Sequence, residues 1–210
     1  MSIQKKQLFT RRIFPTTWVS LFLTVLLFPL GLFLPEWCGW EKGLIENSQV
    51  DILIFGAILS RRFAHHNRDD RQIHNLCLWM IVVWLMMVGR ELSWGRVFFE
   101  PITIGPDGPT FPSIHAIWYG KYVYPVLTVI IISTLIGLWR NFNWEHIKQK
   151  VYISTVDGVL LIIAAIASQL IFERNLILLL KPYSQVLEEL SELIVYWCMV
   201  SILMANGSPK

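Results

Sequence analysis

Long apolar runs separated by short polar segments dominate this chain. A helix that crosses a membrane needs about 20 mostly apolar residues, and the chain contains six runs of about that length. The predicted helices are residues 18–34, 44–60, 76–94, 123–139, 156–172 and 186–205. The pattern predicts an all-α fold, a polytopic membrane helix bundle with six transmembrane helices that forms a single integral membrane domain over residues 1–210.

The fifth run is interrupted by Glu173, Arg174 and Asn175 before the apolar sequence resumes up to Lys181 and Pro182. Charges at the middle of a membrane cost roughly 2.5–3.5 kcal/mol each on an insertion scale. We therefore expect the helix to end at Phe172 and a short interfacial helix to follow. The alternative is one long helix with an internal charge pair.

Lys5, Lys6, Arg11 and Arg12 precede the first apolar run, a pattern that is also typical of a signal peptide. The run is long, and no small-residue cleavage site follows it. These features favour an uncleaved first helix.

The charges of the connecting segments alternate in sign along the chain. Most of the 18 Lys and Arg residues lie in the N-terminal segment, between the second and third helices, and between the fourth and fifth. Cytoplasmic loops carry an excess of such residues. Most of the 15 acids lie on the opposite side. The sequence therefore predicts that both termini are cytoplasmic, as in a multi-pass protein of a bacterial inner membrane.

Composition supports this interpretation, because 54% of the residues are hydrophobic and 16% are charged, against about 25% charged in soluble proteins. The net charge of +3 follows from the loop pattern and does not indicate nucleic-acid binding. The expected partners are membrane lipids and, in one hypothesis, another membrane protein. The three cysteines are well separated and show no metal-binding spacing.

The last predicted helix has acids where lipid is expected. Its purely apolar part, residues 193–205, is too short to span about 30 Å of hydrocarbon at about 1.5 Å per residue. The embedded helix must therefore include Glu188, Glu189 and Glu192, which lie within about one turn. Such residues usually face a bundle interior or a wet cavity and mark functional sites.

The second and third helices bring further polar residues to the same side. Glu46 and Gln49 lie at the outer end of the second helix, Arg90 and Glu91 at the outer end of the third, and His115 in the following loop. We expect Glu46, Glu91, Glu188 and Glu192 to converge there, with Arg90 as counter-ion.

These residue types suggest chemistry at the outer leaflet. Carboxylates with one histidine suit several divalent metals, and arginine holds phosphate or carboxylate groups. The predicted roles cover three groups of residues: Glu91, His115, Glu188 and Glu192 for catalysis; Arg90, Arg96 and Trp94 for substrate binding; Glu46, Glu91, His115 and Glu188 for a divalent metal.

Structural interpretations of the same residues remain open. The acids of the last helix could form a solvated N-terminal turn, favoured by the helix dipole. Arg90 and Glu91 could form a structural ion pair, Trp94 could belong to an interfacial aromatic belt, and His115 could be an ordinary loop residue.

The segment GRELSWGR, residues 89–96, resembles a group of bacterial membrane proteins with a Gly-Glu-Glu-Ile-Ser-Trp-Gly-Gln pattern. The resemblance extends to Glu46-Asn47, His115 and Leu187-Glu188-Glu189, in the same order along the chain. It implies a membrane protein but no particular reaction. Arg90 and Arg96 replace a Glu and a Gln of the pattern, which could change a metal ligand set. A more distant analogy is with ceramidase-like membrane hydrolases, whose paired-His motif is absent.

Three functions are compatible with these observations. The first is a metal-dependent hydrolase or transferase that acts on a lipid or lipid-linked substrate at the outer leaflet. The second is a structural or assembly subunit of a membrane complex. The third is a cation- or proton-coupled transporter, although the acids lie near one face and no inverted repeat is evident.

Overall fold

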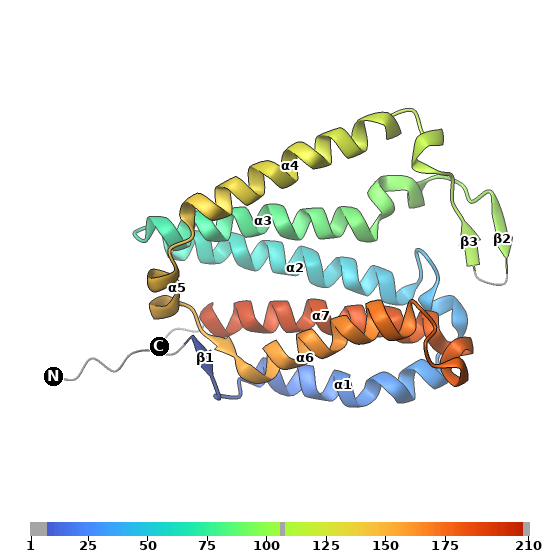
Figure 1. Cartoon of the computed structure of the whole chain (residues 1–210), viewed down its shortest axis with the longest axis horizontal. Helices are drawn as coiled ribbons and strands as arrows, with labels where there is room; N and C mark the ends of the chain where they lie inside the picture. The colour runs from blue at the N-terminus through green and yellow to red at the C-terminus, as the bar shows by residue number, and fades with distance from the viewer. Residues whose placement is uncertain (1–7, 106–107, 208–210) are drawn as a thin grey trace.

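The computed structural model describes residues 8–105 and 108–207, and it confirms the all-helical class (Figure 1). In this part of the chain, six helices form the bundle: α1 (Pro15–Phe33), α2 (Leu44–His66), α3 (Arg71–Glu91), α4 (Gly120–Asn141), α6 (Thr155–Ile166) and α7 (Ser184–Gly207). A π-helix, η4 (Ala167–Phe172), extends α6. Within the described residues, five segments are long and apolar enough to cross a membrane: Pro15–Phe33, Glu36–His66, Arg71–Glu91, Gly120–Asn141 and Thr155–Phe172.

Short elements connect these helices. The helical connectors are η1 (Glu36–Gly39), η2 (Ser93–Phe98), η3 (Ile114–Ala116), α5 (Trp144–Lys150) and η5 (Leu178–Tyr183). Two small two-stranded sheets accompany them: β1 (Phe9–Thr10) pairs in parallel with β4 (Ile153–Ser154), and β2 (Thr103–Gly105) pairs antiparallel with β3 (Gly108–Thr110).

The bundle has two chemically different ends. At one end lie β1, β4, α5 and the connection between α2 and α3 (Figure 1). We call this the basic end, after Arg61, Arg62, Arg68, Arg71 and Lys150. The opposite end, with η1, η2 and the start of α7, is called the acidic end. The pairing of β1 with β4 and a hydrogen bond from the Tyr152 backbone N–H to Asn206 Oδ1 (2.6 Å) place both ends of the described chain at the basic end.

An ion-paired carboxylate fixes α5 beside the start of α3. Asp70 accepts a hydrogen bond from the backbone N–H of Ile73 (3.2 Å) and lies 2.8 Å from His146 Nε2. Burial raises the pKa of the Asp70 carboxyl, but these two contacts outweigh it, so that pKa lies below its ordinary value.

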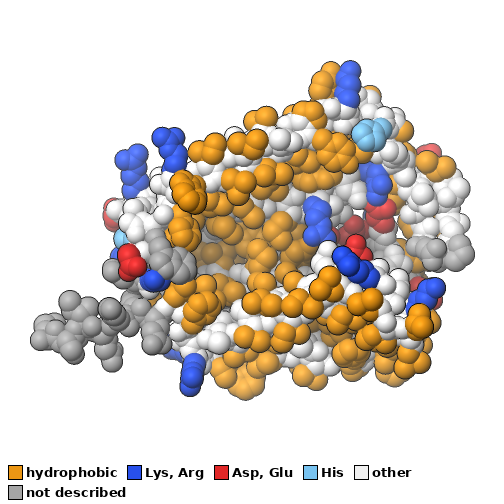
Figure 2. Space-filling view, viewed as in Figure 1, with side chains coloured by type: hydrophobic (Ala, Val, Ile, Leu, Met, Phe, Trp, Pro, Cys, Tyr) orange, Lys and Arg blue, Asp and Glu red, His pale blue; other side chains and the backbone are white. Residues whose placement is uncertain are grey.

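Helix α7 forms the centre of the bundle and packs against α1, α2 and α6. Its buried side chains Leu187, Leu190, Ile194 and Cys198 face α1 and α6, while Tyr196 and Val200 belong to a second core with α2 and α3. Among the described long helices, α4 packs chiefly against α3. A hollow with an apolar floor therefore remains between α4 and α6, and side chains of both charges gather at its acidic end (Figure 2).

Two helix ends bear on the expectations from sequence. Helix α6 and its π extension end at Phe172 and a short 3-10 helix follows, so one long helix with an internal charge pair is ruled out. The predicted end of the third helix at Trp94 is wrong. Helix α3 ends at Glu91 because Ser93, Trp94 and Gly95 adopt positive φ angles of 45°, 56° and 89°, which cannot continue a right-handed helix.

Candidate functional site

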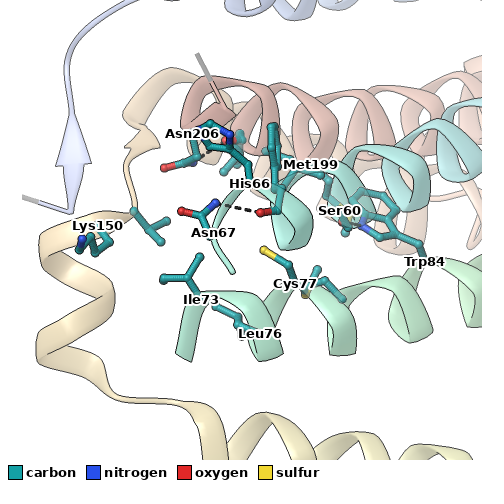
Figure 3. A pocket seen from close by; sticks show the side chains of 15 residues that line it. Ser60, His66, Asn67, Ile73, Leu76, Cys77, Trp84, Lys150, Met199 and Asn206 are labelled. Carbon is teal, nitrogen blue, oxygen red and sulfur yellow. Dashed lines mark hydrogen bonds between the residues drawn. The ribbon is translucent and has the colours of Figure 1, made fainter. Parts of the chain in front are cut away.

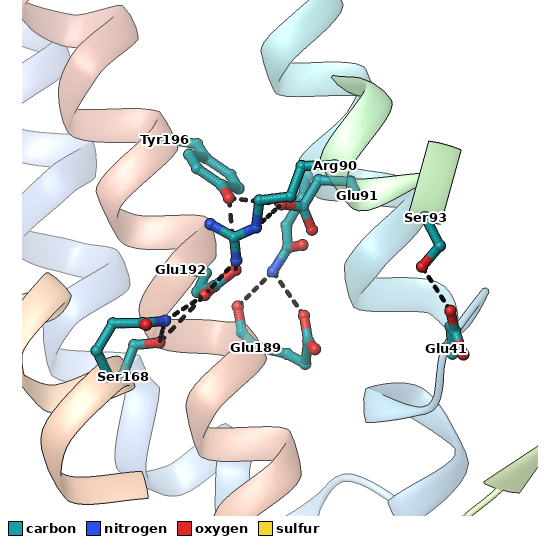
Figure 4. Close-up of polar contacts among 10 residues, drawn as sticks. Glu41, Arg90, Glu91, Ser93, Ser168, Glu189, Glu192 and Tyr196 are labelled. Atoms are coloured by element: carbon teal, nitrogen blue, oxygen red, sulfur yellow. Dashed lines mark hydrogen bonds and ion pairs between the residues drawn. The ribbon is translucent and has the colours of Figure 1, made fainter. Parts of the chain in front are cut away.

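A cluster of buried polar side chains lies at the acidic end, between α2, α3, α7 and η4 (Figure 4). Helix α7 contributes Glu189, Glu192 and Tyr196, whose spacing of three and four residues places them on one helix face. Glu91, the last residue of α3, approaches this face from the other side. We call Glu91, Glu189 and Glu192 the carboxylate cluster.

Arg90 is the cation of this cluster. Its Nη2 donates to both carboxylate oxygens of Glu192 at 2.7 and 2.8 Å, and its Nε lies 3.5 Å from Glu91 Oε1. The Arg90 side chain is 56% exposed, whereas those of Glu91 and Glu192 are 6% and 10% exposed. The half-exposed guanidinium therefore covers two buried carboxylates.

Neutral hydrogen-bond donors stabilise the same carboxylates. The Tyr196 hydroxyl donates to Glu91 Oε1 at 2.6 Å and lies 3.4 Å from Glu192 Oε2. Ser168 Oγ (3.3 Å) and Gln169 Nε2 (3.0 Å) donate to Glu192 Oε1. Both of these donors come from the π-helix η4, a geometry that is frequent at functional sites.

Glu189 is held by an amide from α2. Gln49 is fully buried, and its Nε2 donates to both the backbone carbonyl and Oε2 of Glu189, at 2.8 Å each. The other amide atom, Gln49 Oε1, is buried without a hydrogen-bond partner among the described residues. The amide that contacts Glu189 therefore also carries an unpaired acceptor. Such an acceptor is costly to bury unless a donor or cation reaches it.

The carboxylate cluster has the spacing of a metal site. One ligand oxygen from each of Glu91, Glu189 and Glu192 lies within 4.8 Å of the other two. Arg90 supplies one positive charge against three carboxylates. Oxygen donors of this kind suit hard divalent cations such as Mg²⁺, Mn²⁺ and Ca²⁺. The three glutamates could therefore hold one cation.

A second polar group lies beside the cluster. Glu41 Oε1 accepts from Ser93 Oγ and Arg96 Nη2, both at 2.6 Å. The three positive-φ residues that follow α3 turn the chain back and bring Ser93 and Arg96 to Glu41. This turn leaves the Trp94 ring beside Gly89, where a Cβ would collide with it. Backbone strain of this kind persists where the surrounding structure requires it.

Replacement of Gly95 by alanine tests whether this turn needs glycine. Gly95 has a φ of 89°, a conformation that costs other residues about 1–2 kcal/mol. We expect Gly95→Ala to lower the free energy of unfolding by about that amount. The measurement is denaturant unfolding in detergent, with Gly105→Ala as a control at a glycine in open surroundings. Equal effects of the two substitutions would contradict a strained turn.

The structure brings some predicted residues together and separates others. Arg90, Glu91 and Glu192 meet as described. Glu188 is half-buried and has Glu192, Glu173 and Arg90 as electrostatic neighbours, but among the described residues no hydrogen bond or ion pair joins it to the cluster. Of the four predicted metal ligands, only Glu91 belongs to the carboxylate cluster.

The other predicted positions lie around it. Glu46 is half-buried, accepts from the backbone N–H of Lys42, and interacts electrostatically with Glu91 and Arg96. Arg96 belongs to the Glu41 group, and Trp94 packs on Gly89. His115 is exposed in η3, where its ring lies 6.0 Å from that of Tyr124.

Several members of the site were absent from the predicted set. Tyr196 lies four residues after Glu192, so helical spacing could have identified it. Gln49 and Glu189 were on the expected faces, but nothing in the sequence indicates that they pair. Ser168 and Gln169 reach Glu192 only because residues 167–172 form a π-helix, and Ser93 and Arg96 reach Glu41 only because of the left-handed turn. The sequence pattern predicted neither the π-helix nor the turn.

Comparisons of this chain with protein-family models, with curated proteins and with solved structures found no match. The case for a function therefore depends on the geometry of the site and its position in the bundle.

Proposed function

We propose that the chain crosses a bacterial inner membrane six times, with the basic end in the cytoplasm. The sixth span would be α7, whose 24 residues match the length of the other long helices. Three observations support this arrangement: α7 lies at the bundle centre, the basic residues gather at one end, and both ends of the described chain lie there.

Single-cysteine labelling tests this topology. In a cysteine-free background, a cysteine at exposed Ser113 should react with a membrane-impermeant maleimide added outside intact cells. A cysteine at exposed Asp69 should react only after permeabilisation, because it lies at the basic end. The opposite pattern, or equal labelling of both positions, would contradict the proposed orientation.

Within this topology, we infer that the carboxylate cluster binds one divalent cation and acts on the polar head of a lipid or lipid-linked substrate. The observation that carries this proposal is the approach of three carboxylate oxygens to within 4.8 Å of one another. The amide of Gln49, which donates to Glu189, also carries a buried oxygen without a hydrogen-bond partner among the described residues. Figure 2 shows charged side chains of both signs at the acidic end of the hollow between α4 and α6. The Arg90 side chain, which covers the cluster, is 56% exposed, so a lipid in the membrane could reach it.

The proposed reaction is a metal-assisted hydrolysis or group transfer. A cation held by Glu91, Glu189 and Glu192 would polarise an ester or phosphoester oxygen and activate a water molecule. Arg90, with its half-exposed guanidinium, would hold a phosphate or carboxylate of the head group. Glu188, which lies outside the cluster, would take the proton of the attacking water. Glu188 would then return this proton to the departing alcohol as the ester bond breaks, and the oxygen of the water would stay on the acyl or phosphoryl group.

The contacts of the acids favour this function over an assembly subunit. An acid that pairs with another membrane protein needs a partner's cation. Here Arg90 of the same chain already supplies a cation to Glu91 and Glu192, and the negative charge that remains on the three clustered carboxylates is one that a small ion can balance. The cluster also lies at one end of the bundle, whereas transporter sites lie near the membrane midplane.

Lipid turnover by the purified chain tests the proposed activity. The protein would be incubated in nanodiscs of bacterial total lipid with Mg²⁺, Mn²⁺ or a chelator, and released head groups measured by mass spectrometry. We expect cation-dependent product from the wild type and a loss of more than about 100-fold in Glu91→Gln, comparable to the loss of an essential catalytic group. Identical products from the wild type, Glu91→Gln and chelated protein would overturn the proposal.

A further inference from the structure

A cavity of about 560 Å³ lies toward the basic end, between α2, α3 and α7 (Figure 3). Its volume is within the range of small-molecule sites, roughly 300–1,000 Å³. The cavity is separate from the carboxylate cluster, since its lining along α3 runs from Ile73 to Trp84 and does not include Glu91. An occupant of this cavity is therefore a question independent of the proposed reaction.

The interior of the cavity is apolar. Cys77, Met80 and Trp84 line it from α3, at spacings of three and four residues that put them on one face. Met199 and Leu203, which are four residues apart and so share a face, line it from α7. The one polar group of Trp84 is already used, because its Nε1 donates to Ser60 Oγ at 2.9 Å. An apolar chain fits such walls, whereas a polar ligand would find few partners there.

The mouth of the cavity is polar and has a cation. Asn67 and Asn206 lie at this rim and are fixed by backbone hydrogen bonds, Asn67 Nδ2 to Phe63 O (2.9 Å) and Asn206 Nδ2 to Tyr152 O (2.8 Å). The side chain of Lys150 is 57% exposed at the same rim. Its Nζ lies 3.8 Å from Asp70 Oδ2, which has a closer partner in His146 at 2.8 Å.

The charge around this mouth selects the kind of head group. Arg61, Arg62, Arg68 and Arg71 lie outside the cavity lining but are exposed in the last part of α2, in the connection that follows it, and at the first residue of α3, the same end of the bundle as Lys150. Basic pockets between transmembrane helices on the cytoplasmic side are a known setting for anionic lipid head groups. An amphiphile with a negative head and an apolar tail complements both parts of the cavity.

We propose that this cavity binds one anionic phospholipid from the leaflet at the basic end. One acyl chain occupies the space between α3 and α7, as far as Trp84. The phosphate lies at the rim beside Lys150. This site would bind lipid as a ligand, apart from any lipid processed at the acidic end.

Protection of Cys77 from alkylation tests the position of the tail. Cys77 lines the cavity, whereas Cys38 and Cys198 are buried at 2% and 0% exposure and serve as internal references. The wild-type chain would be treated with an apolar maleimide in nanodiscs of phosphatidylcholine with or without phosphatidylglycerol. At a lipid concentration about ten times the dissociation constant, labelling of Cys77 should fall about tenfold.

Two lysines of α5 provide matched variants. In Lys150→Gln, the labelling of Cys77 should be the same with and without phosphatidylglycerol. In Lys148→Gln, two residues away and outside the cavity lining, the difference in Cys77 labelling should be preserved. Native mass spectrometry should find one retained phosphatidylglycerol per chain in the wild type and Lys148→Gln, and none in Lys150→Gln. Equal Cys77 labelling in both membranes, equal effects of the two variants, or equal protection by soluble glycerol phosphate would overturn the proposal.

Discussion

Arg90→Ala is expected to lower the free energy of unfolding in detergent by about 2–4 kcal/mol, between the values for exposed and fully buried ion pairs. The cause is the loss of the cation that covers two buried carboxylates, since Arg90 Nη2 contacts both oxygens of Glu192 and Nε lies 3.5 Å from Glu91. The measurement is denaturant unfolding followed by tryptophan fluorescence. Arg96→Ala should cost clearly less, because its partner Glu41 keeps a hydrogen bond from Ser93.

A double-mutant cycle separates this coupling from a general loss of structure. Glu192→Gln on the Arg90→Ala background removes the uncompensated charge and should recover part of the lost stability. Glu145 is an exposed acid on α5, and Glu145→Gln combined with Arg90→Ala should recover no stability. Strictly additive losses for Arg90 and Glu192 would mean that Arg90 is not the counter-ion of the cluster.

Asp157→Ala is expected to have a similarly large effect at the basic end, about 2–4 kcal/mol, because buried hydrogen bonds to a charged group are lost and their donors stay unsatisfied. Asp157 is fully buried in the first turn of α6. It accepts from Thr17 Oγ1 at 2.6 Å and Ser20 Oγ at 2.5 Å, which ties α6 to α1. The result is measured by unfolding under the same conditions.

Asp51→Ala provides the control for this prediction, because Asp51 is an exposed acid on α2. We expect its effect to be within about 0.5 kcal/mol of zero, as is usual for surface substitutions. A Thr17→Val variant should lose part of the Asp157 contribution and be non-additive with Asp157→Ala. An Asp157→Ala protein as stable as Asp51→Ala would contradict a structural role for this carboxylate.

The helices could be predicted from sequence because lipid imposes a simple rule, about 20 apolar residues per crossing. The positions of the six long helices follow the apolar runs closely. Their ends did not follow the same rule. Helix α3 begins at Arg71, within a polar stretch, because Asp70 caps it through the backbone N–H of Ile73. It ends at Glu91 because the left-handed turn at residues 93–95 overrides the apolar pattern.

The site could be predicted in part. The position of Arg90 and Glu91 at the end of one helix and of Glu192 in the last helix placed them on the same side, and the structure pairs them. Whether Glu188 or Glu189 joins the cluster depends on the rotation of α7 about its axis. The hydropathy pattern does not define this rotation, because the two consecutive residues are both glutamates. Asp157 had no visible partner in the sequence, because Thr17 and Ser20 lie at the edge of an apolar run 137 or more residues away.

Binding of a divalent cation tests the central claim most directly, and Mn²⁺ is a suitable probe because its electron paramagnetic resonance signal distinguishes bound from free ion. Titration of the purified wild-type chain is expected to show one bound Mn²⁺. Glu189→Gln should weaken binding by more than about 100-fold, since loss of a direct ligand exceeds the 10–100-fold effect of outer-shell residues. Glu145→Gln should bind as the wild type does. Absence of bound Mn²⁺ in the wild type, or equal binding by Glu189→Gln, would contradict a cation site at Glu91, Glu189 and Glu192.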